Sequence, residues 1–203
     1  MEFTDINLKI PKSTDIYFNK TVDPDSVADF NEEFLKSIND YNIEIQKNNA
    51  MLNIMGIDVN NIIYQPVNIH LQTYGGVMYN GFSTYNIISN AVGKYPFDIN
   101  IKCAGTVMSM GIVLLLSVPY ENRFAYKDTT FMIHQMSGCL YGKLKDMEED
   151  IEESRRLNKI MFDIILNNTD ISREKLETVY KEKIDWFIDA EEALKLKLIS
   201  KIL

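Results

Sequence analysis

Residues 104–118 read AGTVMSMGIVLLLSV, a stretch that places the hydroxyl of Ser109 between small residues and an apolar run. The run is far shorter than the roughly 20 apolar residues that span a bilayer, so it predicts a buried helix. A serine directly before a helix is commonly its N-cap. However, Gly105 and Gly111 allow close backbone approach, and the unpaired N–H groups of a helix N-terminus stabilise developing negative charge. Ser109 is therefore a candidate cap and a candidate nucleophile.

The composition is typical of a soluble globular protein, with 203 residues, 46% hydrophobic residues, 25% charged residues and a net charge of -8. This length favours a single domain over 1–203. The negative charge argues against a nucleic-acid partner, because such binding needs clustered Lys and Arg. Cys103 and Cys139 form no CxxC pair, which favours a reducing cytoplasm and argues against structural zinc. The N-terminal MEFTDINLKI lacks the basic and apolar regions of a signal peptide, so neither secretion nor a membrane is expected.

Hydrophobic periodicity predicts an α/β chain in which strands and helices alternate. A strand over 15–22 precedes a long amphipathic helix, and a polar excursion over 48–61 separates that helix from a strand over 67–73. The apolar stripe of the first helix comprises Val27, Phe30, Phe34, Ile38, Tyr41 and Ile45. The remaining expected elements are helices over 77–92, 109–118, 143–167 and 172–184, strands over 98–103, 123–125 and 130–134, and a last helix capped by Asp189.

The chain has only two histidines, His70 and His134, and this limits its chemistry. A serine nucleophile would need one of them as its base. His134 ends an apolar strand in FMIHQM, and His70 lies in mid-strand in VNIHLQT; a lone histidine in either place is more often structural. No HExxH or comparable cluster is present, which argues against a metal enzyme. The TYGG turn at 73–76 offers N–H groups for an oxyanion.

Three segments together resemble the signature regions of the Clp protease proteolytic subunit (ClpP) family. They are AGTVMSMG at 104–111, RFAYKDTTFMIHQM at 123–136 and DWFIDAEEALKLKLISKIL at 185–203. The resemblance extends from about residue 15 to the C-terminus. It implies a ClpP/crotonase-like α/β fold of β-β-α units, with a head domain and a projecting handle helix in the region 135–167. An insertion at about 46–63 makes the chain a divergent member, for which a phage origin is one alternative.

The resemblance implies a serine endopeptidase that hydrolyses unfolded proteins by Ser-His-Asp acyl transfer without a cofactor. The nucleophile position falls on Ser109, the base on His134 and the third member on Asp185. The implied oxyanion-hole residues are Gly76 and Met110, and the implied substrate-binding residues are Gly75, Val77 and Gln135. Substrate would bind as an added strand through main-chain bonds, which tolerates many sequences.

The resemblance also implies assembly into stacked rings of seven, a tetradecamer, through 135–141 and the helix over 143–167. The apolar stripe of that helix, which supports a partner surface, comprises Leu144, Met147, Ile151, Met161, Ile164 and Ile165. Family members receive substrate from an ATP-driven unfoldase. Two aromatic docking positions fall here on Asn68 and His70, which predicts a divergent docking site. Gln72, Thr73 and Tyr74 replace the usual Asn-Ser-Pro, and Met136 replaces a proline, so the substrate groove should also differ.

Two other classes of protein remain as alternatives. A catalytically silent ring or scaffold subunit could keep the fold, although all three catalytic residue types are present. A coenzyme-A-dependent crotonase shares the broad fold but does not need the Ser-His-Asp set. Membrane-associated signal-peptide peptidases usually use a Ser-Lys dyad and fit less well.

Overall fold

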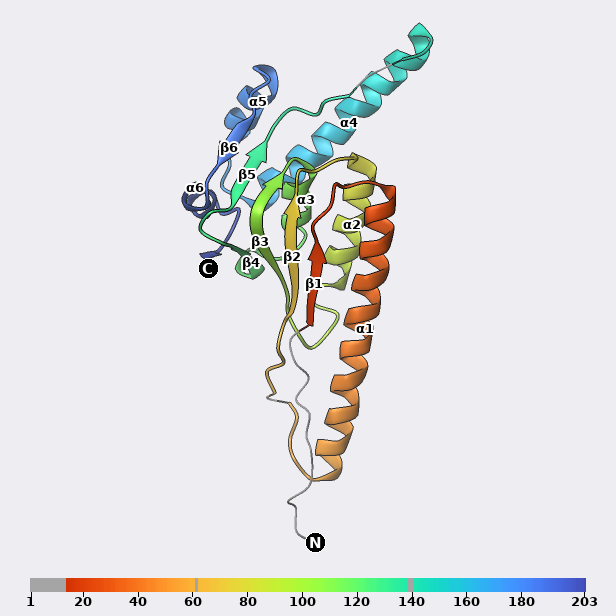
Figure 1. The fold of residues 1–203 in the computed structure, drawn as a ribbon, viewed down its shortest axis with the longest axis vertical. Helices are drawn as coiled ribbons and strands as arrows, with labels where there is room; N and C mark the ends of the chain where they lie inside the picture. The colour runs from red at the N-terminus through yellow and green to blue at the C-terminus, as the bar shows by residue number, and fades with distance from the viewer. Residues whose placement is uncertain (1–13, 61, 139–140) are drawn as a thin grey trace.

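The computed structural model describes residues 14–60, 62–138 and 141–203, and these residues form a mixed α/β structure around one sheet (Figure 1). The sheet has seven strands in the order β1-β2-β3-β4-β7, with β5 pairing β3 and β6 pairing β5. All pairings are parallel except β5 with β6. The strands are β1 (Thr14–Phe18), β2 (Val67–Thr73), β3 (Ile99–Met108), β4 (Arg123–Ala125), β5 (Thr130–Ile133), β6 (Trp186–Ile188) and β7 (Lys201–Ile202).

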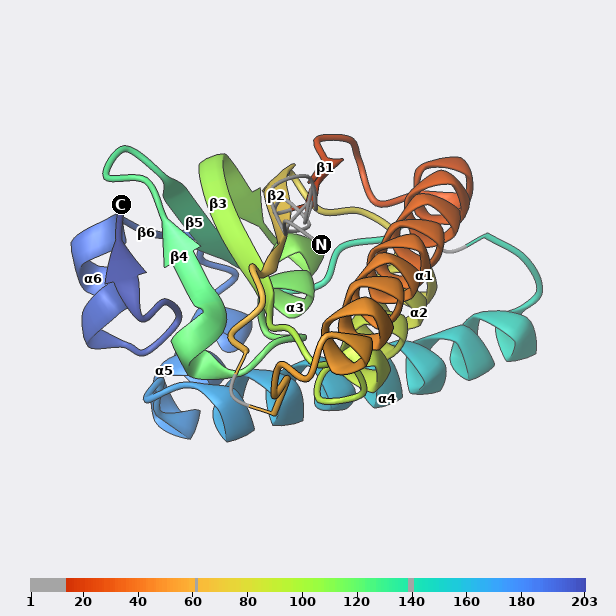
Figure 2. The same cartoon turned by 90° about the horizontal axis from the view of Figure 1, so that it is seen from below.

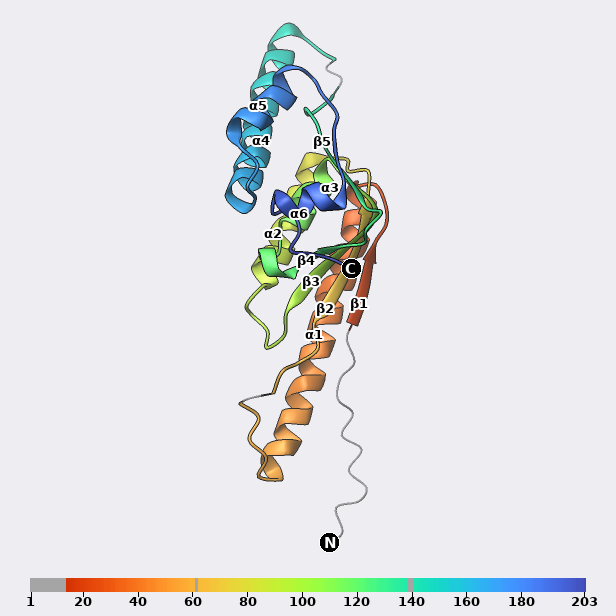
Figure 3. The same ribbon diagram turned by 90° about the vertical axis from the view of Figure 1, so that its left-hand side faces the viewer.

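The helices connect the strands and lie largely to one side of the sheet (Figures 2 and 3). They are α1 (Pro24–Ile54), α2 (Met78–Ala91), α3 (Met110–Leu115), α4 (Leu144–Asn168), α5 (Arg173–Lys181) and α6 (Ala190–Lys195), with a 3-10 turn over Tyr120–Asn122. Parallel strands need such crossovers, because a tight hairpin cannot connect them. Every residue of α3 is buried, as the apolar run predicts. Asp189 caps α6 by accepting a 2.7 Å hydrogen bond from Glu192 N–H, again as predicted.

Helix α1 has the predicted buried stripe, but it is longer than the sequence suggests. It continues to Ile54 and extends well past the end of the sheet, so the polar excursion begins after the helix and not at residue 48. The insertion placed at 46–63 is therefore partly helix and partly loop. Two contacts tie the loop back to the helix: Tyr41 Oη donates to Gln65 O at 2.9 Å, and Tyr64 Oη donates to Asn49 Oδ1 at 2.9 Å.

Strand β3 runs to Met108, five residues beyond the predicted end at Cys103. Its first part pairs with β4, whereas its last part, Thr106–Met108, pairs with β5. Gly105, at a φ of 61°, lies between the two parts and accommodates the change of partner. The following helix is correspondingly shorter than the predicted 109–118. Because the strand reaches Met108, Ser109 stands at its carboxyl end.

The C-terminal region also differs from the prediction. The helix expected over 172–184 ends at Lys181, and Lys183 takes a positive φ of 54°. This break leaves the next residues free to form β6, a short strand that the sequence did not predict. Strand β7 was missed in the same way. The break places Asp185 in the connection that enters β6.

Arg123 holds the C-terminal end of α4 against β4 from a buried position. Its Nε donates to Val118 O at 2.9 Å, and its Nη1 donates to Asn168 O at 2.9 Å. Burial lowers the pKa of Arg123 to about 10, which leaves the guanidinium charged at neutral pH. The cation therefore satisfies the last carbonyl of α4, at a helix end where four carbonyl groups lack intrahelical partners, together with the Val118 carbonyl.

Arg123→Ala should lower the free energy of unfolding by about 3 kcal/mol, because it leaves buried carbonyl oxygens without donors and opens a cavity. Urea denaturation followed by circular dichroism measures this loss. Lys197→Ala, which removes an exposed ion pair with Asp170, is the control and should leave the free energy of unfolding nearly unchanged. Equal losses in the two variants would contradict a structural role for Arg123.

Candidate active site

Ser109 occupies a sharp turn between β3 and α3. Its backbone has a φ of 53° and a ψ of −119°, a region that residues other than glycine rarely adopt. The backbone N–H of Ser109 donates to Met132 O at 2.9 Å, which ties this turn to β5. Its side chain makes no capping hydrogen bond to α3, so the N-cap alternative for the hydroxyl is wrong. Such strain at a polar residue is typical of functional sites.

His134 and Asp185 are brought together by the antiparallel pairing of β5 with β6. Ile133 is paired with Trp186. Because the pairing is antiparallel, His134, which follows Ile133, lies opposite Asp185, which precedes Trp186. His134 Nδ1 lies 3.6 Å from Asp185 Oδ1. This separation exceeds the roughly 2.7–3.2 Å of a direct N–H···O hydrogen bond. The Asp185 side chain is 61% exposed, so its carboxylate remains largely solvated.

The parallel pairing of β3 with β5 brings His134 close to Ser109. Met108 is paired with Met132, and both strands end at the same edge of the sheet. Among the described residues, no hydrogen bond connects the Ser109 hydroxyl to the imidazole. Ser109 and His134 nevertheless line one pocket of about 770 Å³. The carboxyl edge of a parallel sheet is where α/β proteins usually bind ligands.

The turn after β2 passes directly over Ser109. Thr73 Oγ1 accepts a 3.0 Å hydrogen bond from Gly75 N–H and so fixes the start of the turn. A Cβ at Gly75 would lie 2.6 Å from Ser109 Cβ and 2.9 Å from Met110 N, so only glycine permits this approach. In the described part of the chain, the N–H groups of Gly76 and Met110 have no hydrogen-bond acceptor. The pocket that holds Ser109 is thus also lined by two residues whose N–H groups have no acceptor among the described residues.

The pocket brings together most of the residues that the sequence singles out. Ser109, Met110, His134, Gly76 and Val77 all line it, whereas Gly75 and Gln135 lie next to lining residues without lining it themselves. Asp185 is also outside the lining and contacts the pocket through His134. Met136, which the sequence placed in the substrate groove, also lines the pocket, as does Met161 of the predicted apolar stripe. The sequence did not indicate the lining residues Thr21, Val22, Asp23 and Leu157.

One wall of the pocket is held by a polar network between α2 and α4. Tyr79 Oη donates to Glu153 Oε1 at 2.6 Å, and Arg156 donates through Nε and Nη2 to the same carboxylate at 2.6 and 2.7 Å. The hydrogen bonds from Arg156, and then that from Tyr79, lower the pKa of Glu153 to about 2. Glu153 therefore stays ionised, and its charge is compensated on the pocket wall.

Asn68 and His70, the two divergent positions of β2, belong to a polar cluster with Asp15 and Tyr17 of β1. His70 Nε2 lies 2.8 Å from Asp15 Oδ1, and Asn68 Nδ2 donates to the same oxygen at 3.1 Å. The Tyr17 and His70 rings are stacked with centroids 4.7 Å apart. The His70 hydrogen bond is the main cause of a lowered pKa at Asp15. This part of the sheet is therefore polar and internally hydrogen-bonded.

Two kinds of feature are absent from the described ranges. No helix in 14–60, 62–138 or 141–203 combines the length and apolar character needed to cross a bilayer. Within the same residues, no three His, Cys, Asp or Glu side chains gather closely enough to hold a metal ion. Cys139 lies outside the described residues, and Cys103 is a buried free thiol.

A family model described as Clp protease matches residues 34–203, a segment that contains Ser109, His134 and Asp185. The chain belongs to the Clp protease family. The ATP-dependent Clp protease proteolytic subunit of Deinococcus radiodurans is 32% identical over 139 residues, which cover 68% of this chain and 65% of the relative. The subunit of the same name from Porphyromonas gingivalis is 33% identical over 138 residues, which cover 68% of this chain and 59% of the relative. The aligned part thus spans somewhat less than two thirds of either relative.

The fold agrees with this membership. A point mutant of ClpP1 from Listeria monocytogenes superposes with a TM-score of 0.65 and 20% sequence identity, covering 93% of this chain and 90% of that one. At this identity the likeness concerns the fold alone. The predicted ClpP-like α/β architecture is confirmed.

Proposed function

We propose that this Clp protease family member is a serine endopeptidase that hydrolyses unfolded polypeptides by acyl transfer. The observation that carries the proposal is the placement of Ser109 and His134 on one pocket, with the β5–β6 pairing setting Asp185 opposite the imidazole. Unpaired N–H groups lie beside the same serine. These are the parts that acyl transfer requires: a nucleophile, a base, an orienting carboxylate and oxyanion donors.

In the proposed mechanism, His134 takes the proton of Ser109 as Oγ attacks the carbonyl carbon of the scissile bond. The carbonyl oxygen becomes an oxyanion, which accepts hydrogen bonds from the N–H groups of Gly76 and Met110. The imidazolium then gives its proton to the leaving amine, the C–N bond breaks, and an acyl-enzyme remains. Water then attacks the acyl carbon while His134 takes its proton, the bond to Ser109 Oγ breaks, and the imidazolium returns the proton to Oγ as the acid leaves. Asp185 orients the imidazole and stabilises its positive charge.

The mechanism requires the site to tighten when substrate binds. The 3.6 Å between His134 and Asp185 must shorten, and a hydrogen bond must form between Ser109 and His134. Catalytic hydrogen bonds are often long without substrate and close only in the complex. An extended peptide running past Val77 and Gln135 would place its carbonyl group over Ser109 and press the imidazole toward the hydroxyl.

The proposal includes a closed chamber made of stacked seven-membered rings of this chain in the cytoplasm. The first half of α4 projects from the rest of the structure, and its stripe residues Leu144 and Ile151 are exposed there (Figure 1). The later stripe residues Met161 and Ile165 are buried within the chain. An exposed continuation of a buried apolar stripe suits contact with another copy. An ATP-driven unfoldase remains part of the proposal, and it would meet the polar cluster at Asn68 and His70.

A fluorophosphonate probe tests the proposal directly. Ser109 Oγ should attack the phosphorus and displace fluoride while His134 takes the proton, and mass spectrometry should locate the adduct on Ser109. His134→Ala should slow labelling about 10³-fold, because the general base is lost. His70→Ala, which removes the chain's other histidine, is the matched control and should label like the wild type. Absence of labelling in the wild type, or equal rates in the two histidine variants, would refute the proposed chemistry.

A catalytically silent ring subunit is the second candidate. It is favoured by one observation, the absence of a direct hydrogen bond between Ser109 and His134 among the described residues. The probe separates the two, since a silent subunit would leave Ser109 unlabelled. The third alternative was a coenzyme-A-dependent crotonase. Since the chain matches the Clp protease family, no observation favours it.

A further inference from the structure

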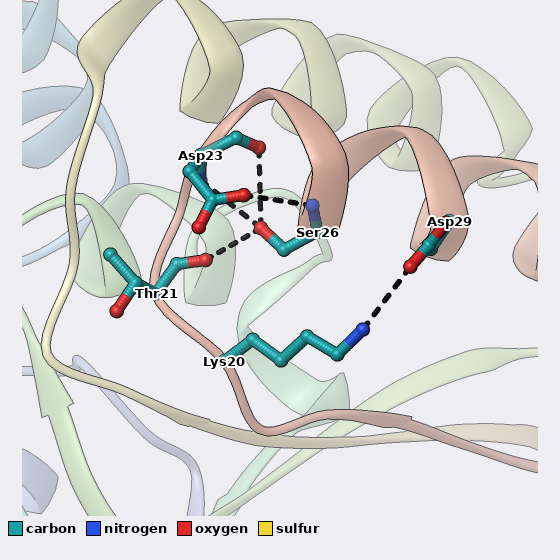
Figure 4. Close-up of polar contacts among 5 residues, drawn as sticks. All are labelled: Lys20, Thr21, Asp23, Ser26 and Asp29. Atoms are coloured by element: carbon teal, nitrogen blue, oxygen red, sulfur yellow. Dashed lines mark hydrogen bonds and ion pairs between the residues drawn. The ribbon is translucent and has the colours of Figure 1, made fainter.

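The turn between β1 and α1 is unusually well fixed by hydrogen bonds (Figure 4). Asp23 is the N-cap of α1, and its Oδ1 accepts from Ser26 N–H at 2.8 Å. In return, Ser26 Oγ accepts from Asp23 N–H at 3.1 Å. This reciprocal arrangement is a capping box with serine in the place usually taken by Glu or Gln. Ser26 Oγ also donates to Thr21 O at 2.5 Å, so one buried hydroxyl connects both sides of the turn.

This turn is paired with the glycine turn that passes over Ser109. Val22 N–H donates to Gly75 O at 2.8 Å, and Val77 N–H donates to Val22 O at 2.7 Å. Val22 and Gly76 thus form an isolated parallel bridge. The hydrogen bonds of a parallel bridge are made by the neighbours of one bridge residue, here Gly75 and Val77. The N–H and C=O of the residue between them, Gly76, point away from the partner strand. The pairing therefore turns the Gly76 N–H away from Val22 and leaves it available to an oxyanion.

Contact between the two turns is as close as backbones permit. A Cβ at Gly76 would overlap the carbonyl oxygen of Val22 and lie 3.1 Å from Thr21 Cγ2. Any movement of the Thr21–Asp23 backbone is therefore transmitted to Gly76. Since Val22 itself is fully buried, the bridge is also shielded from competing water.

We propose that Asp23 and Ser26 are positioning residues for the oxyanion-binding N–H of Gly76. The inference rests on the proposed serine-peptidase function. The two side chains fix the Thr21–Asp23 turn, this turn fixes Gly76 through Val22, and neither Asp23 nor Ser26 needs to touch the reacting atoms. Oxyanion donors act only when they are aligned with the charge that develops in the transition state, so a shift of about 1 Å at Gly76 would weaken catalysis about tenfold or more.

Ser26→Ala is the principal test, because it removes one buried hydroxyl and little volume. We expect kcat for an unstructured fluorogenic peptide to fall about tenfold while KM stays within about twofold, since the lost stabilisation is specific to the transition state. Asp23→Ala should give the same fall in kcat. Ser26→Thr, which keeps a hydroxyl, should restore most of the rate.

Asp29→Ala is the matched control. It removes a neighbouring exposed ion pair, in which Lys20 Nζ lies 3.2 Å from Asp29 Oδ2 (Figure 4). In the described chain, the Asp29 carboxylate makes no contact with the backbone of the turn. Its kcat should equal that of the wild type. Titration with the fluorophosphonate probe counts the competent sites in every variant, so kcat is expressed per folded site and a loss of stability alone cannot imitate the effect.

The outcomes separate this inference from the function on which it rests. A wild type that is neither labelled nor hydrolytic would overturn the proposed function. An active wild type whose Ser26→Ala and Asp23→Ala variants keep full kcat per titrated site would overturn the positioning role alone. The positioning role would also be overturned if both variants changed KM and not kcat, or if Ser26→Thr were as slow as Ser26→Ala.

Discussion

Ser109→Ala should reduce hydrolysis of an unstructured peptide by on the order of 10⁴-fold or more, because the variant lacks the proposed nucleophile. The fold and the oligomer should persist, since the hydroxyl caps no helix and makes no structural hydrogen bond in the described chain. Peptide turnover measures the activity, and light scattering measures the mass of the assembly. Turnover by the variant at the wild-type rate would remove Ser109 from the mechanism.

A second substitution at the same position tests whether the turn stores strain. Ser109 has a φ of 53°, which costs a residue with a Cβ more than it costs glycine. Ser109→Gly should therefore be about 1 kcal/mol more stable than Ser109→Ala, although both lack the nucleophile. A glycine variant that is inactive and more stable would indicate that the strain is retained for function. If alanine were the more stable of the two, the strain argument would be wrong.

The sequence predicted those elements whose signal is local and repeated. The stripe from Val27 to Ile45 marks one face of α1 because burial selects apolar residues every three or four positions. Strand β4 was placed correctly at 123–125. The elements that were missed, β6 and β7, are too short for periodicity, and their pairing with distant strands alone stabilises them. The end of α1 was misplaced because Asn-rich segments have low helix propensity, yet the helix continues to Ile54, and Asn49 near its end exchanges hydrogen bonds with Tyr64.

For the site, motif resemblance indicated the residues that carry chemistry but not those that position them. Ser109 and His134 follow the ends of two strands, β3 and β5, that pair with each other. No sequence pattern indicates this pairing. The β5–β6 pairing explains why Asp185 faces His134, yet β6 has only three residues and gives no reliable signal. The bridge of Val22 with Gly76 joins segments that lie far apart in the chain and carries no motif at all. Such positions become visible only when the backbone contacts are known.

Gly75→Ala should lower kcat/KM by about 10³-fold, because the added methyl group would occupy the space between the glycine turn and the nucleophile. The new Cβ would lie 2.6 Å from Ser109 Cβ and 2.8 Å from Met108 O. Both neighbours belong to the turn that directs the hydroxyl, so they cannot yield without moving it. Met110 N, 2.9 Å from the same Cβ, would move as well, and one oxyanion donor would be misplaced together with the nucleophile.

Gly93→Ala separates this steric effect from backbone strain. Gly93 has a φ of 74°, similar to the 92° of Gly75, but a Cβ there would meet nothing within 4 Å. Both variants should lose about 1 kcal/mol of stability from the unfavourable φ, whereas only Gly75→Ala should lose activity. Thermal unfolding and kcat/KM per titrated site measure the two effects. If Gly75→Ala were as active as Gly93→Ala, the two turns would have room to separate, and the close backbone contact over Ser109 would not determine the geometry of the site.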